Sequence, residues 1–155
     1  VAVIKQLDKG LNNIASFFES IASEPGAGAA GGLGAGARYF LGAKIVSGSG
    51  WVMDKVHFNR ALLKADFIIT GEGKIDSSTW GGKVVSEVIK RCDKVFKQTI
   101  LVSGAFESSP NFPIFLDEND VFTISSRSSD MADSLSRAAE ILEQIGEEIA
   151  LKYLN

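Results

Sequence analysis

The chain is short of the residues on which several common kinds of site depend. Its 155 residues contain one cysteine, Cys92, so no disulfide can form within the chain. They contain one histidine, His57, which excludes a His-based catalytic triad or a multi-histidine metal site made from this chain alone. Because disulfides are typical of oxidising compartments, the lone cysteine predicts a cytoplasmic protein.

Charge and hydrophobic runs exclude further classes of function. The net charge is -3, which argues against nucleic acid as the main partner, because phosphate backbones recruit strongly basic surfaces. No apolar run approaches the ~20 residues needed to cross a bilayer, so we expect no membrane partner. The composition, with 45% hydrophobic and 23% charged residues, is that of an ordinary globular protein.

The second part of the chain alternates short β-branched runs with helical patterns. The runs "DFIIT" (66–70), "TILVSG" (99–104) and "DVFTIS" (120–125) are typical of buried parallel strands. Apolar residues at helical spacing predict a helix over 84–92 and a last helix that begins near Asp130, its N-cap. This order predicts an α/β fold, a parallel sheet with flanking helices.

The first part of the chain shows helical patterns and a glycine-rich stretch in place of this alternation. Apolar spacings of three and four predict a helix over residues 5–22. A glycine-rich stretch over 23–37 leads into a helix that ends near Gly42. Weaker patterns predict a short strand over 43–46 and a helix over 51–64. A domain boundary is expected near residue 65, so the fold class is α/β with a smaller glycine-rich, helix-containing N-terminal segment.

Residues 26–31 read Gly-Ala-Gly-Ala-Ala-Gly, a formal G-x-G-x-x-G pattern. A dinucleotide site also needs a preceding strand and an acidic residue roughly 20 positions later, and both are missing. Two interpretations remain open. The glycines could expose backbone N–H groups to an anion at a helix N-terminus, or they could let helices pack closely.

A second glycine stretch, "GEGKID" (71–76), follows the first predicted strand, which we expect to end at Thr70 in a turn. Ligands of parallel sheets bind outside the carboxyl ends of the strands. Glu72 and Asp76 are suitable ligands for Mg²⁺, which prefers one or two carboxylates together with phosphates and water. The alternative interpretation is a polar surface turn with helix-capping residues.

Cations accompany these carboxylates. Lys74 and Lys83 could neutralise phosphate charge, and Gly81-Gly82 would open the helix that carries Lys83, so that its first N–H groups face an anion. Phosphoryl transfer depends on such positioning by cations and fixed dipoles. The stretch therefore predicts a metal-phosphate site.

Together the two glycine stretches resemble the bacterial glycerate kinase family. The match is carried by "PGAGAAGGLGAG" (25–36) and "ADFIITGEGKID" (65–76), and less specifically by "GGK" (81–83) and "VSGAFE" (102–107). The resemblance implies a two-domain cytoplasmic enzyme that uses ATP and Mg²⁺ to phosphorylate a hydroxyl of glycerate, its small-molecule substrate. The site would lie in the cleft between the domains.

The resemblance also implies a division of the chain and a set of site residues. Residues 66–155 would be the C-terminal share of a Rossmann-like α/β domain, and residues 1–65 the end of a domain inserted into it. The expected catalytic residues are Glu72, Asp76 and Lys83, with Glu72 and Asp76 as metal ligands; the expected nucleotide-binding residues are Gly26, Gly28, Gly31, Gly32, Gly71, Gly73, Lys74 and Gly82.

The chain departs from the family pattern in two ways. Family members are longer and open with a strand followed by Asp-Ser-Phe-Lys, to which nothing here corresponds, and Ser78 stands where glutamine is more common. We therefore expect the chain to belong to a longer protein, to lack turnover alone, and to self-associate at an unpaired sheet edge. The alternative function is a non-catalytic α/β module that binds a nucleotide or anion.

Overall fold

The computed structural model describes residues 2–154. The chain divides into two compact units, Val1–Gly48 and Ser49–Asn155. Among the described residues no helix is both long enough and apolar enough to cross a membrane. The domain boundary near residue 65, which concerns a longer parent protein, stays a prediction.

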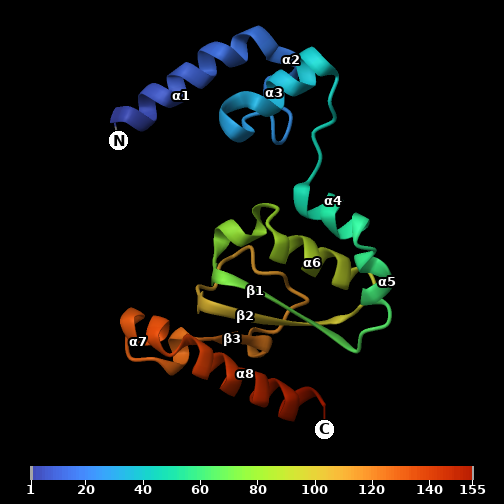
Figure 1. The fold of residues 1–155 in the computed structure, drawn as a ribbon, viewed down its shortest axis with the longest axis vertical. Coiled ribbons are helices and arrows are strands. Elements are labelled where there is room, and N and C mark those ends of the chain that lie inside the picture. Colours follow the sequence, from blue (N-terminus) through green and yellow to red (C-terminus); the bar gives the residue numbers. More distant parts are fainter. Residues whose placement is uncertain (1, 155) are drawn as a thin grey trace. The chain divides into compact units, whose positions relative to one another are not determined.

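The described residues of the first unit form helices joined by turns and irregular segments, and they contain no strand (Figure 1). The helix predicted over 5–22 is interrupted, because a 3-10 turn at Ser16–Phe18 separates two α-helices. The predicted helix end at Gly42 is confirmed, since this residue caps the third helix with φ +63°. The strand predicted over 43–46 is wrong, because these residues pair with no strand among the described residues. The helices of this unit are α1 (Ala2–Ala15), α2 (Glu19–Ala22) and α3 (Ala29–Leu41).

The helix predicted over 51–64 is two helices, α4 (Gly48–Lys55) and α5 (Phe58–Leu62). His57 separates them in the left-handed region with φ +55°, and a residue in that conformation cannot continue a right-handed helix. Met53 and Leu62 nevertheless bury their side chains in one apolar cluster.

The three predicted strands form one parallel sheet, as expected. They are β1 (Phe67–Ile75), β2 (Gln98–Phe106) and β3 (Val121–Thr123), in the order β1-β2-β3. The expectation that the first strand ends at Thr70 is wrong, because β1 continues through the Gly-Glu-Gly sequence. The reason is close strand approach: a Cβ at Gly71 would lie 1.7 Å from the Val102 carbonyl oxygen, so only glycine fits.

Helices cover both faces of this sheet, with α6 (Val84–Asp93) on one side and α8 (Ala138–Tyr153) on the other (Figure 1). The predicted last helix is divided at Arg137 into α7 (Met131–Ser136) and α8. Asp130 caps α7 as predicted, accepting a hydrogen bond from the Asp133 backbone N–H. Buried side chains from α8, β2 and β3 form one core cluster, and those from α6, β1 and β2 form another: Ile100, Phe122, Ile141, Ile145 and Ile149, and Ile75, Val85, Ile89 and Leu101.

One carboxylate at the amino end of the sheet joins three elements. Asp120, just before β3, accepts hydrogen bonds from Gln98 at the start of β2 and from Lys152 and Tyr153 at the end of α8. Burial opposes the charge of Asp120, but the hydrogen bonds from Lys152 and Tyr153 outweigh it and lower the pKa of this carboxyl. Asp120 therefore fastens the last helix to the sheet.

Candidate active site

Glu72, in the carboxyl-terminal half of β1, is held between a hydroxyl and an ammonium group. Its Oε1 accepts a hydrogen bond of 2.5 Å from Thr79 Oγ1, and Thr79 is fully buried. Its Oε2 lies 3.6 Å from Lys83 Nζ, which also donates to Ser78 Oγ at 2.9 Å. The Glu72 side chain is 21% exposed and that of Lys83 49%. A largely enclosed carboxylate is thus paired with a cation that solvent reaches.

Asp76 follows β1 directly and begins a 3-10 helix, Ser77–Gly81. Its Oδ1 accepts from the backbone N–H and the hydroxyl of Ser78 at 2.9 and 2.7 Å, while Thr79 Oγ1 accepts from the Asp76 N–H at 3.1 Å. This reciprocal arrangement is a capping box, so the capping interpretation is confirmed for Asp76. The hydrogen bonds from Ser78, and then the charge of Lys74, lower the pKa of Asp76.

Lys74 is the second lysine beside these carboxylates. Its Nζ lies 2.7 Å from Glu107 Oε2 and 3.6 Å from Asp76 Oδ2. Glu107 follows β2 and donates its backbone N–H to the Ile75 carbonyl, which keeps the two strand ends together. The hydrogen bond with Glu107 raises the pKa of Lys74. Carboxylates and lysines therefore alternate along the network.

The glycines around this network differ in why a side chain would be unfavourable at their positions. Gly71 and Gly104 allow close strand approach, whereas a Cβ at Gly73 would meet nothing within 4 Å. Gly82 has φ +98° and ends the 3-10 helix, after which Lys83 is the N-cap of α6. The N-cap residue of α6 thus carries a cation, and both a cation and the backbone N–H groups of a helix N-terminus favour an anion.

The glycine-rich stretch of the first unit combines close packing with open backbone. Ala30, Gly31 and Gly32 have consecutive positive φ values of 50°, 68° and 92°, and Gly26 has φ +89°. A Cβ at Gly34 would lie 2.5 Å from the Gly26 carbonyl oxygen, which supports the close-packing interpretation at that point. At Gly28 and Gly31 a Cβ would meet nothing within 4 Å, so anion binding by this backbone stays a prediction.

The structure brings together the charged residues that the sequence singled out, Glu72, Lys74, Asp76 and Lys83, in one hydrogen-bonded and ion-paired network. Gly26, Gly28, Gly31 and Gly32 belong to the other compact unit. Sequence reasoning missed Thr79 and Glu107. Thr79 could have been found, because the spacing Asp-x-x-Thr before a helix is a capping pattern.

The carboxylates of the described residues do not form a Mg²⁺ site by themselves. No group of three or more His, Cys, Asp or Glu side chains among residues 2–154 is placed to hold a metal ion. Two carboxylates, Glu72 and Asp76, fit Mg²⁺ only together with phosphate oxygens and water, which is how this ion commonly binds in phosphoryl-transfer sites. The residues present are therefore compatible with a metal that arrives with a nucleotide.

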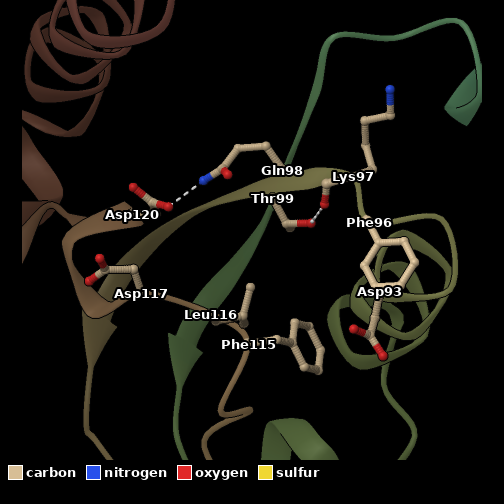
Figure 2. Close-up of a pocket in the computed structure, with 9 residues that line it drawn as sticks. All are labelled: Asp93, Phe96, Lys97, Gln98, Thr99, Phe115, Leu116, Asp117 and Asp120. Atoms are coloured by element: carbon tan, nitrogen blue, oxygen red, sulfur yellow. Dashed lines mark hydrogen bonds between the residues drawn. The ribbon is translucent and has the colours of Figure 1, made fainter.

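A cavity of about 360 Å³ lies at the opposite, amino end of the sheet (Figure 2). It lies beside the start of β2, with Gln98 and Thr99 on one wall and Phe96 and Phe115 nearby (Figure 2). None of the residues that sequence analysis selected lines it. The cavity and the charged network thus occupy different ends of the sheet.

Comparison with known proteins decides the family. A model of the glycerate kinase family matches residues 1–154. The chain belongs to the glycerate kinase family. A glycerate kinase of Halalkalibacterium halodurans is 34% identical over 155 residues, covering 97% of this chain and 41% of the relative.

Two further relatives are also named as kinases of glycerate, and this chain again covers only part of their length. A glycerate kinase of Bacillus cereus is 32% identical over 155 residues, with 96% of this chain and 40% of the relative covered. A glycerate 2-kinase of Escherichia coli is 36% identical over 109 residues, with 67% and 29% covered. The chain thus spans about two fifths of the length of the first two relatives.

Proposed function

We propose that the protein containing this chain is a cytoplasmic kinase that transfers the γ-phosphoryl group of ATP to a hydroxyl of glycerate. Support comes from the family and from the names of its relatives, which are glycerate kinases. The observation that carries the proposal is the network of Glu72, Lys74, Asp76 and Lys83 at the carboxyl end of β1.

Lys83 is the proposed phosphate-binding cation. Its side chain is half exposed and Lys83 is the N-cap residue of α6, so phosphate oxygens could bind to the ammonium and to the first helix N–H groups. Its contacts with Ser78 and Glu72 hold it at this position before a ligand binds. Lys74 supplies a second positive charge on the same network. Such fixed charges stabilise the transferring phosphoryl group without further reorganisation.

Glu72 is the proposed partner of the glycerate hydroxyl. Thr79 and Lys83 each occupy one side of its carboxylate, and a carboxylate can accept up to about four hydrogen bonds. Glu72 can therefore accept a further hydrogen bond from the attacking hydroxyl and hold its proton. Mg²⁺ bound with the phosphates would neutralise charge on them, with Asp76 and Glu72 as its protein ligands.

The test is turnover by the parent protein that contains residues 1–155. Purified protein is given ATP, Mg²⁺ and D-glycerate, and ADP release is coupled to NADH oxidation; lactate and glycerol serve as comparison acceptors. We expect turnover in the range of about 1–100 per second with glycerate. A folded parent that binds ATP but phosphorylates no hydroxy acid would contradict the proposal and favour a non-catalytic nucleotide-binding module.

A further inference from the structure

A row of polar side chains crosses the sheet beside the charged network. Glu72 on β1 is directly paired with Ser103 on β2, and Ser103 is paired with Thr123 on β3. Two residues earlier on their strands, Leu101 and Val121 both pack in the cluster beneath α6. Because side chains alternate along a strand, Ser103 and Thr123 lie on that same face. Glu72, in register with Ser103, shares it.

Ser103 is unusual in this row because its hydroxyl is buried without a partner. The residue is 3% exposed, and its Oγ has no hydrogen bond among the described residues. The other buried hydroxyl of β2, that of Thr99, donates to the Lys97 carbonyl. Buried hydroxyls almost always have a partner, and an unmet one destabilises the folded state. The missing partner of Ser103 therefore points to a group that residues 2–154 do not supply.

The strands approach closely on both sides of the Glu72–Ser103 pair. A Cβ at Gly71 would lie 1.7 Å from the Val102 carbonyl oxygen, and one at Gly104 would lie 2.5 Å from the Gly73 carbonyl oxygen. Both glycines are needed for β1 and β2 to stay paired through this region. Glycine thus keeps Ser103 and Glu72 directly paired on neighbouring strands.

We propose that Ser103 is a substrate-binding residue whose hydroxyl bonds to a hydroxyl group of the small hydroxy acid held against Glu72. The inference rests on the proposed function and extends it by assigning this subsite. The ligand hydroxyl donates to the Glu72 carboxylate and accepts from Ser103 Oγ.

The test compares Ser103→Ala with Thr99→Val in the parent protein. Both variants remove a buried hydroxyl from β2, but only the first removes one beside Glu72. We expect Ser103→Ala to raise KM for glycerate about 5- to 10-fold, to leave KM for ATP unchanged, and not to lower the Tm, because the hydroxyl it removes has no partner in the folded chain. Thr99→Val should leave both KM values unchanged. A merely structural role of Ser103 would lower the Tm in Ser103→Ala, or change both KM values together.

Single-hydroxyl analogues sharpen the test. Lactate and 3-hydroxypropanoate each lack one glycerate hydroxyl, and both are measured as competitive inhibitors of the wild type and of Ser103→Ala. We expect the substitution to weaken one analogue and leave the other unchanged, because Ser103 contacts only one hydroxyl. An unchanged glycerate KM in Ser103→Ala, or equal weakening of both analogues, overturns the inference while the kinase proposal stands. If the parent protein phosphorylates no hydroxy acid, both the Ser103 inference and the kinase proposal are contradicted.

Discussion

The two ends of the parallel sheet differ in how their charged groups are used. At the amino end, Asp120 accepts hydrogen bonds from three partners on β2 and α8, and its side chain is only 13% exposed. At the carboxyl end, the side chains of Lys74 and Lys83 are about half exposed, although Lys74 also lies 2.7 Å from Glu107 Oε2 and Lys83 donates to Ser78 Oγ at 2.9 Å. A buried hydroxyl there, that of Ser103, has no partner among the described residues.

This difference separates stability from function along the same strands. Charges that are enclosed by several partners, such as Asp120, stabilise the fold, whereas charges that solvent reaches, such as Lys74 and Lys83, can exchange a partner for a ligand. Polar groups that are buried and unpartnered destabilise the fold, and they persist where another requirement favours them. We therefore expect substitutions at the amino end to lower the free energy of unfolding, and those at the carboxyl end to lower activity. The exception is a substitution at the carboxyl end that forces the backbones of two strands apart.

Gly71→Ala is that exception and should have the largest effect on stability. Its new Cβ would meet the Val102 carbonyl oxygen at 1.7 Å, and a backbone atom cannot move aside as a flexible side chain can. We expect a loss of about 3 kcal/mol or more in the free energy of unfolding, measured by urea titration.

Gly73→Ala is the matched control on the same strand, because a Cβ there meets nothing within 4 Å. We expect this variant to stay within about 1 kcal/mol of the wild type. Equal losses in the two variants would show that β1 and β2 do not approach closely at Gly71, and that the Gly-Glu-Gly sequence does not form the strand described.

Sequence patterns predict the architecture better than the site. The β-branched runs and the spacing of Val85, Ile89 and Cys92 depend on burial alone, so the three strands and α6 could be predicted. The extension of β1 could not, because Gly71 is favourable in a turn and is selected here by a carbonyl on another strand. Likewise the pairing of Glu72 with Ser103 depends on strand register, which local sequence does not encode.

Asp120→Asn should have the next largest effect. It keeps the shape of the side chain but removes the charge that binds Lys152 and Tyr153, so the end of α8 loses its attachment to the sheet. We expect a loss of about 1–2 kcal/mol, because hydrogen bonds to charged groups are worth about 1.5–3 kcal/mol and Lys152 is partly exposed.

Asp76→Asn is its counterpart at the carboxyl end and should cost less than about 1 kcal/mol, since asparagine also caps helices well. Chemical unfolding of both variants under one condition decides the comparison. A larger loss for Asp76→Asn than for Asp120→Asn would contradict the assignment of stability to the amino end.

Acid should produce the smallest of these effects. The pKa values of Asp76 and Asp120 are lowered in the folded protein. Both groups therefore contribute stability above the ordinary aspartate pKa of about 3.9, and this contribution is lost as the pH falls through the folded values. We expect the Tm to fall below about pH 4, and to fall less steeply in Asp120→Asn. An unchanged slope in that variant would show that its carboxylate is not linked to folding.

The central claim is that the charged network at the carboxyl end of β1 performs phosphoryl transfer, and Lys83 tests it most directly. The measurement is kcat for ATP-dependent phosphorylation of glycerate by the parent protein, compared between Lys83→Ala and Lys90→Ala. Lys90 is an exposed lysine of the same helix, away from its N-terminus. We predict that Lys83→Ala lowers kcat about 100-fold or more, with Tm near that of the wild type, and that Lys90→Ala is unaffected. A folded Lys83→Ala protein that keeps kcat within about threefold of the wild type would contradict the account.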